Sequence, residues 1–125
     1  MIKARPCAGD LAAAERILNE ISPFVWRKYL DFAAIADVQA MKQQVHAYRG
    51  HGEIAVEGHN IKLGRGGIRE VEFFAQTQQL IAGGRNSQLR DRETLVTLDK
   101  LAEGGWIAAE TRDDMREAYL FLRSV

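Results

Sequence analysis

The chain has 125 residues, a length that suits one small domain and is too short for several independent ones. Hydrophobic residues make up 46% of it, which excludes a disordered tail, and its 17 basic and 17 acidic residues cancel, which disfavours a nucleic-acid binder. Cys7 is the single cysteine, so an internal disulfide and a cysteine-rich zinc site are excluded. We expect no signal peptide, no contact with a membrane or nucleic acid, and a cytoplasmic location.

The first half of the sequence predicts helices. Asp10 is placed to cap a first helix, whose apolar residues from Leu11 to Ile21 recur at three and four residues. Ser22 and Pro23 predict a new helix start, because serine suits a cap and proline the first turn. From Asp31 a helical stripe runs to a stop near Gly50 and Gly52, with Ile35, Val38, Met41, Val45 and Tyr48 on its apolar side.

At the start of the second half, the spacing of the apolar residues changes from helical to alternating. Apolar and polar residues alternate from Glu53 to Leu63, which predicts an irregular or short hairpin insert. Three further helices follow, ended by the glycine pairs at 83–84 and 104–105 and, for the last, running to or nearly to Val125. Their expected inward residues are Ile68, Val71, Phe74, Ala75 and Ile81; Leu95, Leu98 and Leu101 after a cap at Asp91; and Met115, Ala118, Tyr119 and Leu122. Trp26 and Trp106 are expected in the core.

These elements predict an all-α helical bundle of about five or six helices. We expect residues 1–125 to form a single helical module. Because the last amphipathic pattern still runs at Val125, we also expect the chain to be a fragment of a larger enzyme.

The stretch HNIKLGRGGIREVEFF, residues 59–74, concentrates glycines and charges. Glycines before a helix expose backbone N–H groups and the positive end of the helix dipole, which favours an anion such as phosphate. The pattern matches neither a Walker loop nor a dinucleotide fingerprint. Glycines before a helix more often form just a tight turn, here followed by a solvated polar face. That polar face would carry Arg69, Glu72, Gln76 and Gln79, at spacings of three, four and three.

No metal site is expected in the chain. His46, His51 and His59 lack the spacing of helical zinc ligands, and no cysteine lies near them. Cys7 has no base that the sequence places beside it, so we interpret it as a structural or incidental thiol.

The segment IKLGRGGIREVEFFAQTQQLIAGGR resembles the part of bifunctional glutamine synthetase adenylyltransferase/adenylyl-removing enzymes that follows a nucleotidyltransferase core. The flanks IKARPCAGD, FVWRKYLDFAAIADVQAMK and AYLFLR are similar to the same family, so the resemblance covers nearly the whole chain. In this family one half removes AMP from glutamine synthetase by phosphorolysis and the other attaches it from ATP. The sequence after the glycines, Ile68, Arg69 and Glu70, resembles that of the removing half. The family more commonly has isoleucine at the next position, where this chain has Val71.

The resemblance implies a helical module beside an active site. The metal-binding carboxylates of the family lie in a Gly-Ser signature followed by Asp-x-Asp, and this chain lacks both. The resemblance therefore implies that Mg²⁺ is bound by a core outside this chain. We expect no catalytic residue and no cofactor within the chain itself. The implied partners are glutamine synthetase, the PII signalling protein, and ATP or ADP with phosphate. The candidate residues for a nucleotide or phosphate cleft are Lys62, Gly64, Arg65, Gly66, Gly67, Arg69, Glu70 and Glu72.

Two alternatives remain open. The chain could be a docking module that holds domains or partner proteins without touching nucleotide, with Arg69 and Glu72 simply paired with each other. It could also be the helical appendage of a related PII uridylyltransferase, which the removing-type motif disfavours.

Overall fold

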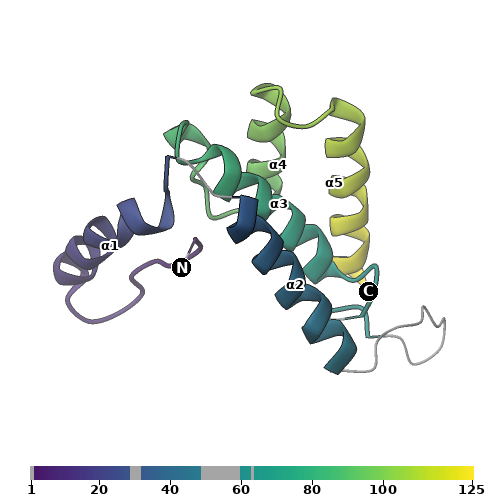
Figure 1. Ribbon diagram of the computed structural model, residues 1–125, viewed down its shortest axis with the longest axis horizontal. Coiled ribbons are helices and arrows are strands. Elements are labelled where there is room, and N and C mark those ends of the chain that lie inside the picture. Colours follow the sequence, from purple (N-terminus) through teal and green to yellow (C-terminus); the bar gives the residue numbers. More distant parts are fainter. Residues whose placement is uncertain (1, 29–31, 49–59, 63) are drawn as a thin grey trace.

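The computed structural model describes residues 2–28, 32–48, 60–62 and 64–125 (Figure 1). Across these residues the chain forms α1 (Leu11–Val25), α2 (Phe32–Tyr48), α3 (Ile68–Ala82), the 3-10 turn η1 (Ser87–Leu89), α4 (Thr94–Glu103) and α5 (Ala109–Ser124). The described residues contain no strand, so the all-α prediction is confirmed. The hairpin predicted at 53–63 lies outside the described residues except at Asn60, Ile61 and Lys62. None of the helices in the described part of the chain combines the length and apolar character needed to cross a membrane.

Among the described residues, three helices form the core. α3 runs through the middle of the molecule and packs against both α4 and α5, which also pack on each other (Figure 1). One cluster of buried side chains joins all three helices, and a second joins α3, η1 and α4. Their members are Val71, Ala75, Leu98 and Tyr119 in the first, and Ala82, Leu89 and Leu101 in the second. Because Leu98 and Leu101 are fully buried, each contributes about 1.5–3 kcal/mol of hydrophobic stabilisation.

α1 begins as predicted but does not end as predicted. The Asp10 carboxylate accepts a hydrogen bond from the backbone amide of Ala13 at 2.9 Å, which confirms the cap. The prediction of a new helix start at Ser22 and Pro23 is wrong, since α1 continues through Pro23 to Val25. Pro23 removes the N–H that would donate to the Asn19 carbonyl, and the helix ends two residues later. α1 buries no residue, and Leu11, Ile17 and Phe24 are exposed.

The residues after α1 lie against the end of α3. A Cβ atom built on Gly83 would approach the Trp26 ring to 2.8 Å, and one on Gly84 would overlap the Arg27 carbonyl oxygen. Gly83 has ordinary helical backbone angles, so this glycine pair is required by close approach rather than by a left-handed helix end. The Arg90 guanidinium lies 5.5 Å from the centre of the Trp26 ring.

The predicted helix from Asp31 is confirmed as α2, and its single lysine reaches α3. The Lys42 ammonium pairs with the Glu70 carboxylate at 3.0 Å and lies 5.1 Å from the centre of the Phe73 ring. Met41 is 65% exposed, so this part of the α2 stripe does not enter the core.

The connection between α4 and α5 reverses the chain at two glycines. Gly105 adopts a φ of 73°, and the amides of Gly105 and Trp106 donate to the carbonyls of Ala102 and Leu101. This is the Schellman arrangement, in which a left-handed glycine closes a helix. Trp106 is 39% exposed, so the prediction that it lies in the core is wrong.

α5 extends to Ser124, as predicted. Tyr119 is buried and Met115 and Leu122 are partly buried, in agreement with their predicted inward positions. Ala118, predicted to face inward with them, is exposed. Arg112 and Arg116 of α5 both pair with Asp99 of α4, at 3.8 and 3.0 Å.

Candidate functional site: a cationic groove beside the glycine loop

The loop from Asn60 to Gly67 folds back onto the start of α3. The amides of Ile68 and Arg69 donate to the carbonyls of Ile61 and Lys62, at 2.9 and 3.2 Å. Gly67 fits because a Cβ atom there would come within 2.5 Å of the Ile61 carbonyl oxygen. Gly66 has a φ of 75°, which a residue with a side chain adopts only with strain.

The backbone amides that the sequence predicted to bind an anion donate hydrogen bonds within the loop itself. The amides of Gly64 and Gly67 donate to the carbonyls of Asn60 and Gly64, and the Glu70 amide donates to Gly67. The prediction of exposed amides at this helix start is therefore wrong. A ligand at this place would have to be bound by side chains.

Glu70 stabilises the loop through its carboxylate. One of its carboxylate oxygens accepts from the Gly66 amide at 2.9 Å, and the other pairs with Lys42 of α2. A glutamate in the first helical turn that returns to an amide preceding the helix resembles a capping box. Its position explains why a glutamate follows the glycines without requiring a ligand.

Beside the loop lies a groove of about 670 Å³ between the start of α3 and the end of α5. The end of α5 and the loop before α3 are neighbours in Figure 1. The charged side chains in the groove are Lys3, Lys62, Arg69, Glu72 and Arg123. Gln76 and Tyr119 add polar groups, and Ile61, Ile68 and Leu122 supply apolar surface. Counted over the residues that the structure describes, four cationic side chains against one carboxylate give the groove an electrostatic preference for anions.

Glu72 is engaged with a residue from the start of the chain. Its carboxylate lies 4.0 Å from the Lys3 ammonium, which also donates to the Thr94 hydroxyl at 2.8 Å. The Arg69 side chain forms no ion pair with any residue that the structure describes, so the predicted pairing of Arg69 with Glu72 is absent. Arg69 is exposed and remains available to a ligand.

The structure separates the predicted site residues into two groups. Lys62, Arg69 and Glu72 line the groove, whereas Glu70 faces α2. Gly64, Gly66 and Gly67 shape the loop and do not line the groove, and the exposed Arg65 is likewise not among the lining residues.

Sequence reasoning missed three groove residues. Tyr119 and Arg123 lie four residues apart on α5, with the Arg123 guanidinium 5.8 Å from the centre of the Tyr119 ring. Their spacing places them on one face of a helix, but the apolar pattern of α5 predicts only a core position for Tyr119. Lys3 lies far from the glycine loop in sequence, and no local pattern connects the two.

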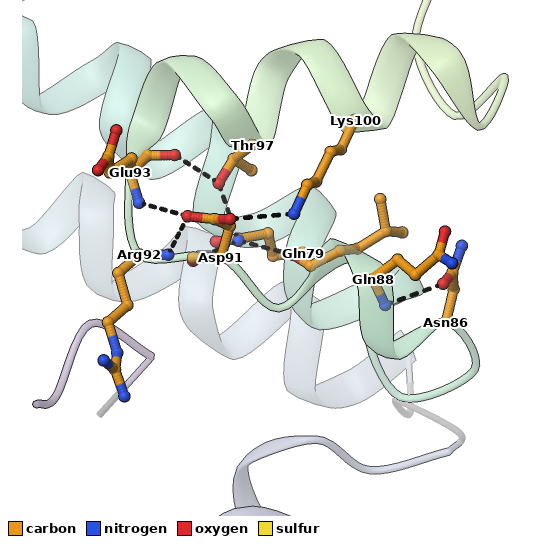
Figure 2. A network of polar contacts seen from close by, with 9 residues as sticks. Gln79, Asn86, Gln88, Asp91, Arg92, Glu93, Thr97 and Lys100 are labelled. Atoms are coloured by element: carbon orange, nitrogen blue, oxygen red, sulfur yellow. Dashed lines mark hydrogen bonds and ion pairs between the residues drawn. The ribbon is translucent and has the colours of Figure 1, made fainter.

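Gln79, predicted on the solvated polar face of α3, is instead buried, with 1% of its surface exposed. Its amide nitrogen donates to the carbonyls of Leu89 and Asp91 at 2.8 Å and to the Thr97 hydroxyl at 2.9 Å (Figure 2). Because this nitrogen carries two hydrogens, at least one is shared between two acceptors. The side chain thereby ties α3 to the η1–α4 connection, which a helical periodicity cannot reveal.

Asp91 precedes α4 instead of capping it directly. The N-cap of α4 is Glu93, and the Asp91 carboxylate accepts from the amides of Arg92 and Glu93 and pairs with Lys100 at 3.0 Å (Figure 2). The hydrogen bond from the Glu93 amide, followed by that from Lys100, holds the pKa of Asp91 below its ordinary value.

The groove does not suit a divalent cation. Among the described residues Glu72 is its one carboxylate, and no three histidine, cysteine, aspartate or glutamate side chains gather as metal ligands. His51 and His59 lie outside the described residues, and nothing is described of the His46 side chain.

Comparison with known proteins adds two findings. The family profile described as GlnD PII-uridylyltransferase matches residues 36–125. Curated proteins named bifunctional glutamine synthetase adenylyltransferase/adenylyl-removing enzyme are similar to the whole chain. The protein of Rhodopseudomonas palustris (strain TIE-1) is 67% identical over 125 residues, which are 100% of this chain and 13% of that protein.

Two further relatives carry the same name. The protein of Mesorhizobium japonicum is 65% identical over 100% of this chain, and that of Rhizobium meliloti (strain 1021) is 67% identical over 99% of it. In each case the chain spans 13% of the relative's length. The chain thus belongs to the family of the GlnD PII-uridylyltransferase profile, and within it is similar to a segment of glutamine synthetase adenylyltransferase/adenylyl-removing enzymes.

Proposed function

We propose that this chain is the helical module of the adenylyl-removing half of an enzyme that controls glutamine synthetase by reversible adenylylation. The observation that carries the proposal is the groove beside the glycine loop, where Lys62 and Arg69 join two cations from other parts of the chain. Such a surface suits the phosphates of a nucleotide, because arginine and lysine form strong charge-assisted hydrogen bonds with phosphate oxygens.

The relatives support the identity of the larger enzyme. Those cited are named for glutamine synthetase adenylylation and adenylyl removal and align with this chain over nearly its full length. The assignment to the removing half rests on Ile68, Arg69 and Glu70 after the glycine pair, a sequence that resembles that half. We further propose that the larger enzyme is cytoplasmic, uses ATP or ADP and phosphate, and responds to the PII signalling protein.

In this proposal the chain supplies one wall of the active site and the nucleotidyltransferase core supplies the other. Mg²⁺, bound by the core, would neutralise phosphate charge during transfer. The residues of this chain bind and orient: Arg69 and Lys62 contact phosphate, and Glu72 positions the Lys3 ammonium.

A docking module is the second candidate. The exposed apolar residues of α1, Leu11, Ile17 and Phe24, favour it, since they would suit contact with another domain. Docking alone does not explain why cationic side chains from three separate segments line one groove.

The experiment compares the 125-residue chain with the full-length enzyme that contains it. Phosphate-dependent release of ADP from adenylylated glutamine synthetase is measured for each. We expect activity from the full-length enzyme and none from the chain alone, because the carboxylates that bind Mg²⁺ are absent from its sequence. Phosphorolysis by the chain alone, or a full-length enzyme that cannot remove AMP, would contradict the proposal.

A further inference from the structure

Tyr119 combines a buried ring with an unused hydroxyl. The residue is 8% exposed, and its ring packs with Val71, Ala75 and Leu98 in the core. Its hydroxyl forms no hydrogen bond with any residue that the structure describes. The hydroxyl is the one polar group of this otherwise buried side chain, and it is available to donate a hydrogen bond to a ligand.

The hydroxyl opens into space beside α5. In the described part of the chain, every fully enclosed polar side-chain atom has a partner, so the unpartnered Tyr119 oxygen is not enclosed. Tyr119 lines the groove described above and also a neighbouring pocket of about 280 Å³. The two spaces therefore meet at this side chain.

The wall shared by the two spaces consists of hydrogen-bond donors. Lys3, Tyr119 and Arg123 line both, Arg69 lies on one side, and Arg92 lies on the other. The Lys3 ammonium is held in place by the Thr94 hydroxyl and Glu72. Arg123 contacts the Tyr119 ring but has no carboxylate partner among the described residues.

We propose that this shared wall binds the phosphate group of a small ligand, with the Tyr119 hydroxyl donating a hydrogen bond to a phosphate oxygen. Arg123 and Lys3 supply the compensating charge. A phosphate suits a wall made of donors because it offers several acceptor oxygens and carries up to two negative charges. The proposal deepens the proposed function and rests on it for the kind of ligand, a nucleotide phosphate or inorganic phosphate.

The test measures binding to the 125-residue chain by backbone amide chemical shifts. The chain is titrated separately with inorganic phosphate, ADP and adenosine. We expect saturable shifts at Tyr119 and Arg123 with phosphate, with ADP, or with both, and none with adenosine. Binding of phosphate alone would assign the wall to free phosphate, and binding of ADP alone would assign it to a nucleotide.

Two variants and two matched controls complete the test. Tyr119→Phe keeps the buried ring and removes the hydroxyl, and we expect it to weaken binding about tenfold, as does the loss of one hydrogen bond to a charged group. Arg123→Gln should weaken binding to a similar degree. Ser124→Ala removes a hydroxyl from the same helix and Arg16→Gln removes an exposed charge from α1, and both should bind as the unchanged chain does.

Three results would overturn the proposal. These are no saturable binding of phosphate or ADP at millimolar concentrations, unchanged affinity in Tyr119→Phe, or adenosine binding as tightly as ADP. The proposed function is judged separately, from turnover by the full-length enzyme, so failure of one proposal is distinguishable from failure of the other.

Discussion

At the scale of single residues, the glycine loop is determined by two different constraints on adjacent positions. Gly66 needs a positive φ of 75° but has open space around it. Gly67 has an ordinary φ but no room for a Cβ atom between the carbonyls of Ile61 and Gly64. The two positions should therefore respond differently to the same substitution.

We predict that Gly66→Ala lowers the free energy of unfolding by about 1–2 kcal/mol, the cost of a left-handed conformation for a residue with a Cβ atom. Gly66→Asn should cost less, because asparagine tolerates this region. Gly67→Ala should cost more than Gly66→Ala, because carbonyl groups of the loop would have to move. Urea unfolding of the three variants measures this, and equal stability of Gly66→Ala and the unchanged chain would refute the account of the loop.

Gln79 is the residue whose predicted environment was most wrong. From sequence it shares a polar face with Arg69, Glu72 and Gln76, and periodicity gives no reason to separate it from them. The structure buries it because the chain after α3 turns back over this point, bringing the carbonyls of Leu89 and Asp91 to its amide. Long-range contacts of this kind are invisible to a local pattern.

We predict that Gln79→Leu lowers the free energy of unfolding by about 2–4 kcal/mol, because it leaves buried carbonyl groups without a donor. Gln78→Leu, on the same helix and only partly buried, is the matched control and should change stability by about 0.5 kcal/mol or less. Urea unfolding of both variants tests this. A Gln79→Leu variant as stable as the control would show that the network in Figure 2 contributes little.

At the scale of elements, the connection from η1 to α4 depends on Asp91. Its carboxylate accepts from two successive backbone amides and pairs with Lys100, so the charged form is favoured in the folded chain. A pKa held below its ordinary value of 3.8 contributes stability that is present above that value and lost as pH falls through the lower, folded-state pKa.

We predict that Asp91→Asn destabilises the chain at neutral pH and that its difference from the unchanged chain shrinks as pH falls from about 5 toward 2. Asparagine keeps one acceptor oxygen but loses the charge that binds Lys100. The measurement is the free energy of unfolding of both proteins across this range. A difference that stays constant with pH would show that the Asp91 charge does not stabilise the fold.

The helices themselves were largely predictable because their apolar residues repeat at helical spacing. α2 to α5 occur where the sequence places them, and Leu98 and Leu101 are buried as expected. The helix start predicted at Ser22 and Pro23 is wrong because α1 accommodates the proline at the cost of one backbone hydrogen bond and ends two residues later. The glycines at 83 and 84 were predicted as a helix stop, but the physical reason, contact with Trp26 and Arg27, requires the tertiary structure.

At the scale of the whole molecule, the candidate site is assembled from the start of the chain, the glycine loop and α5. Sequence reasoning identified Lys62, Arg69 and Glu72 because they lie close together along the chain. It missed Lys3 and Arg123, which only the fold brings to the same groove. In the same fold Glu70 pairs with Lys42 of α2 and does not line the groove.

Substitution of Arg69 in the full-length enzyme tests the central claim most directly. Arg69 is exposed and unpaired among the described residues, so Arg69→Ala should leave the thermal midpoint nearly unchanged. If the groove contacts phosphate during the reaction, the same variant should remove AMP from glutamine synthetase at least about tenfold more slowly, a loss of roughly 1.4 kcal/mol of transition-state stabilisation. Arg16→Ala, an exposed arginine on α1, is the control and should keep its rate. An unchanged rate in Arg69→Ala would contradict the account, as would a loss of rate that merely follows a lowered thermal midpoint.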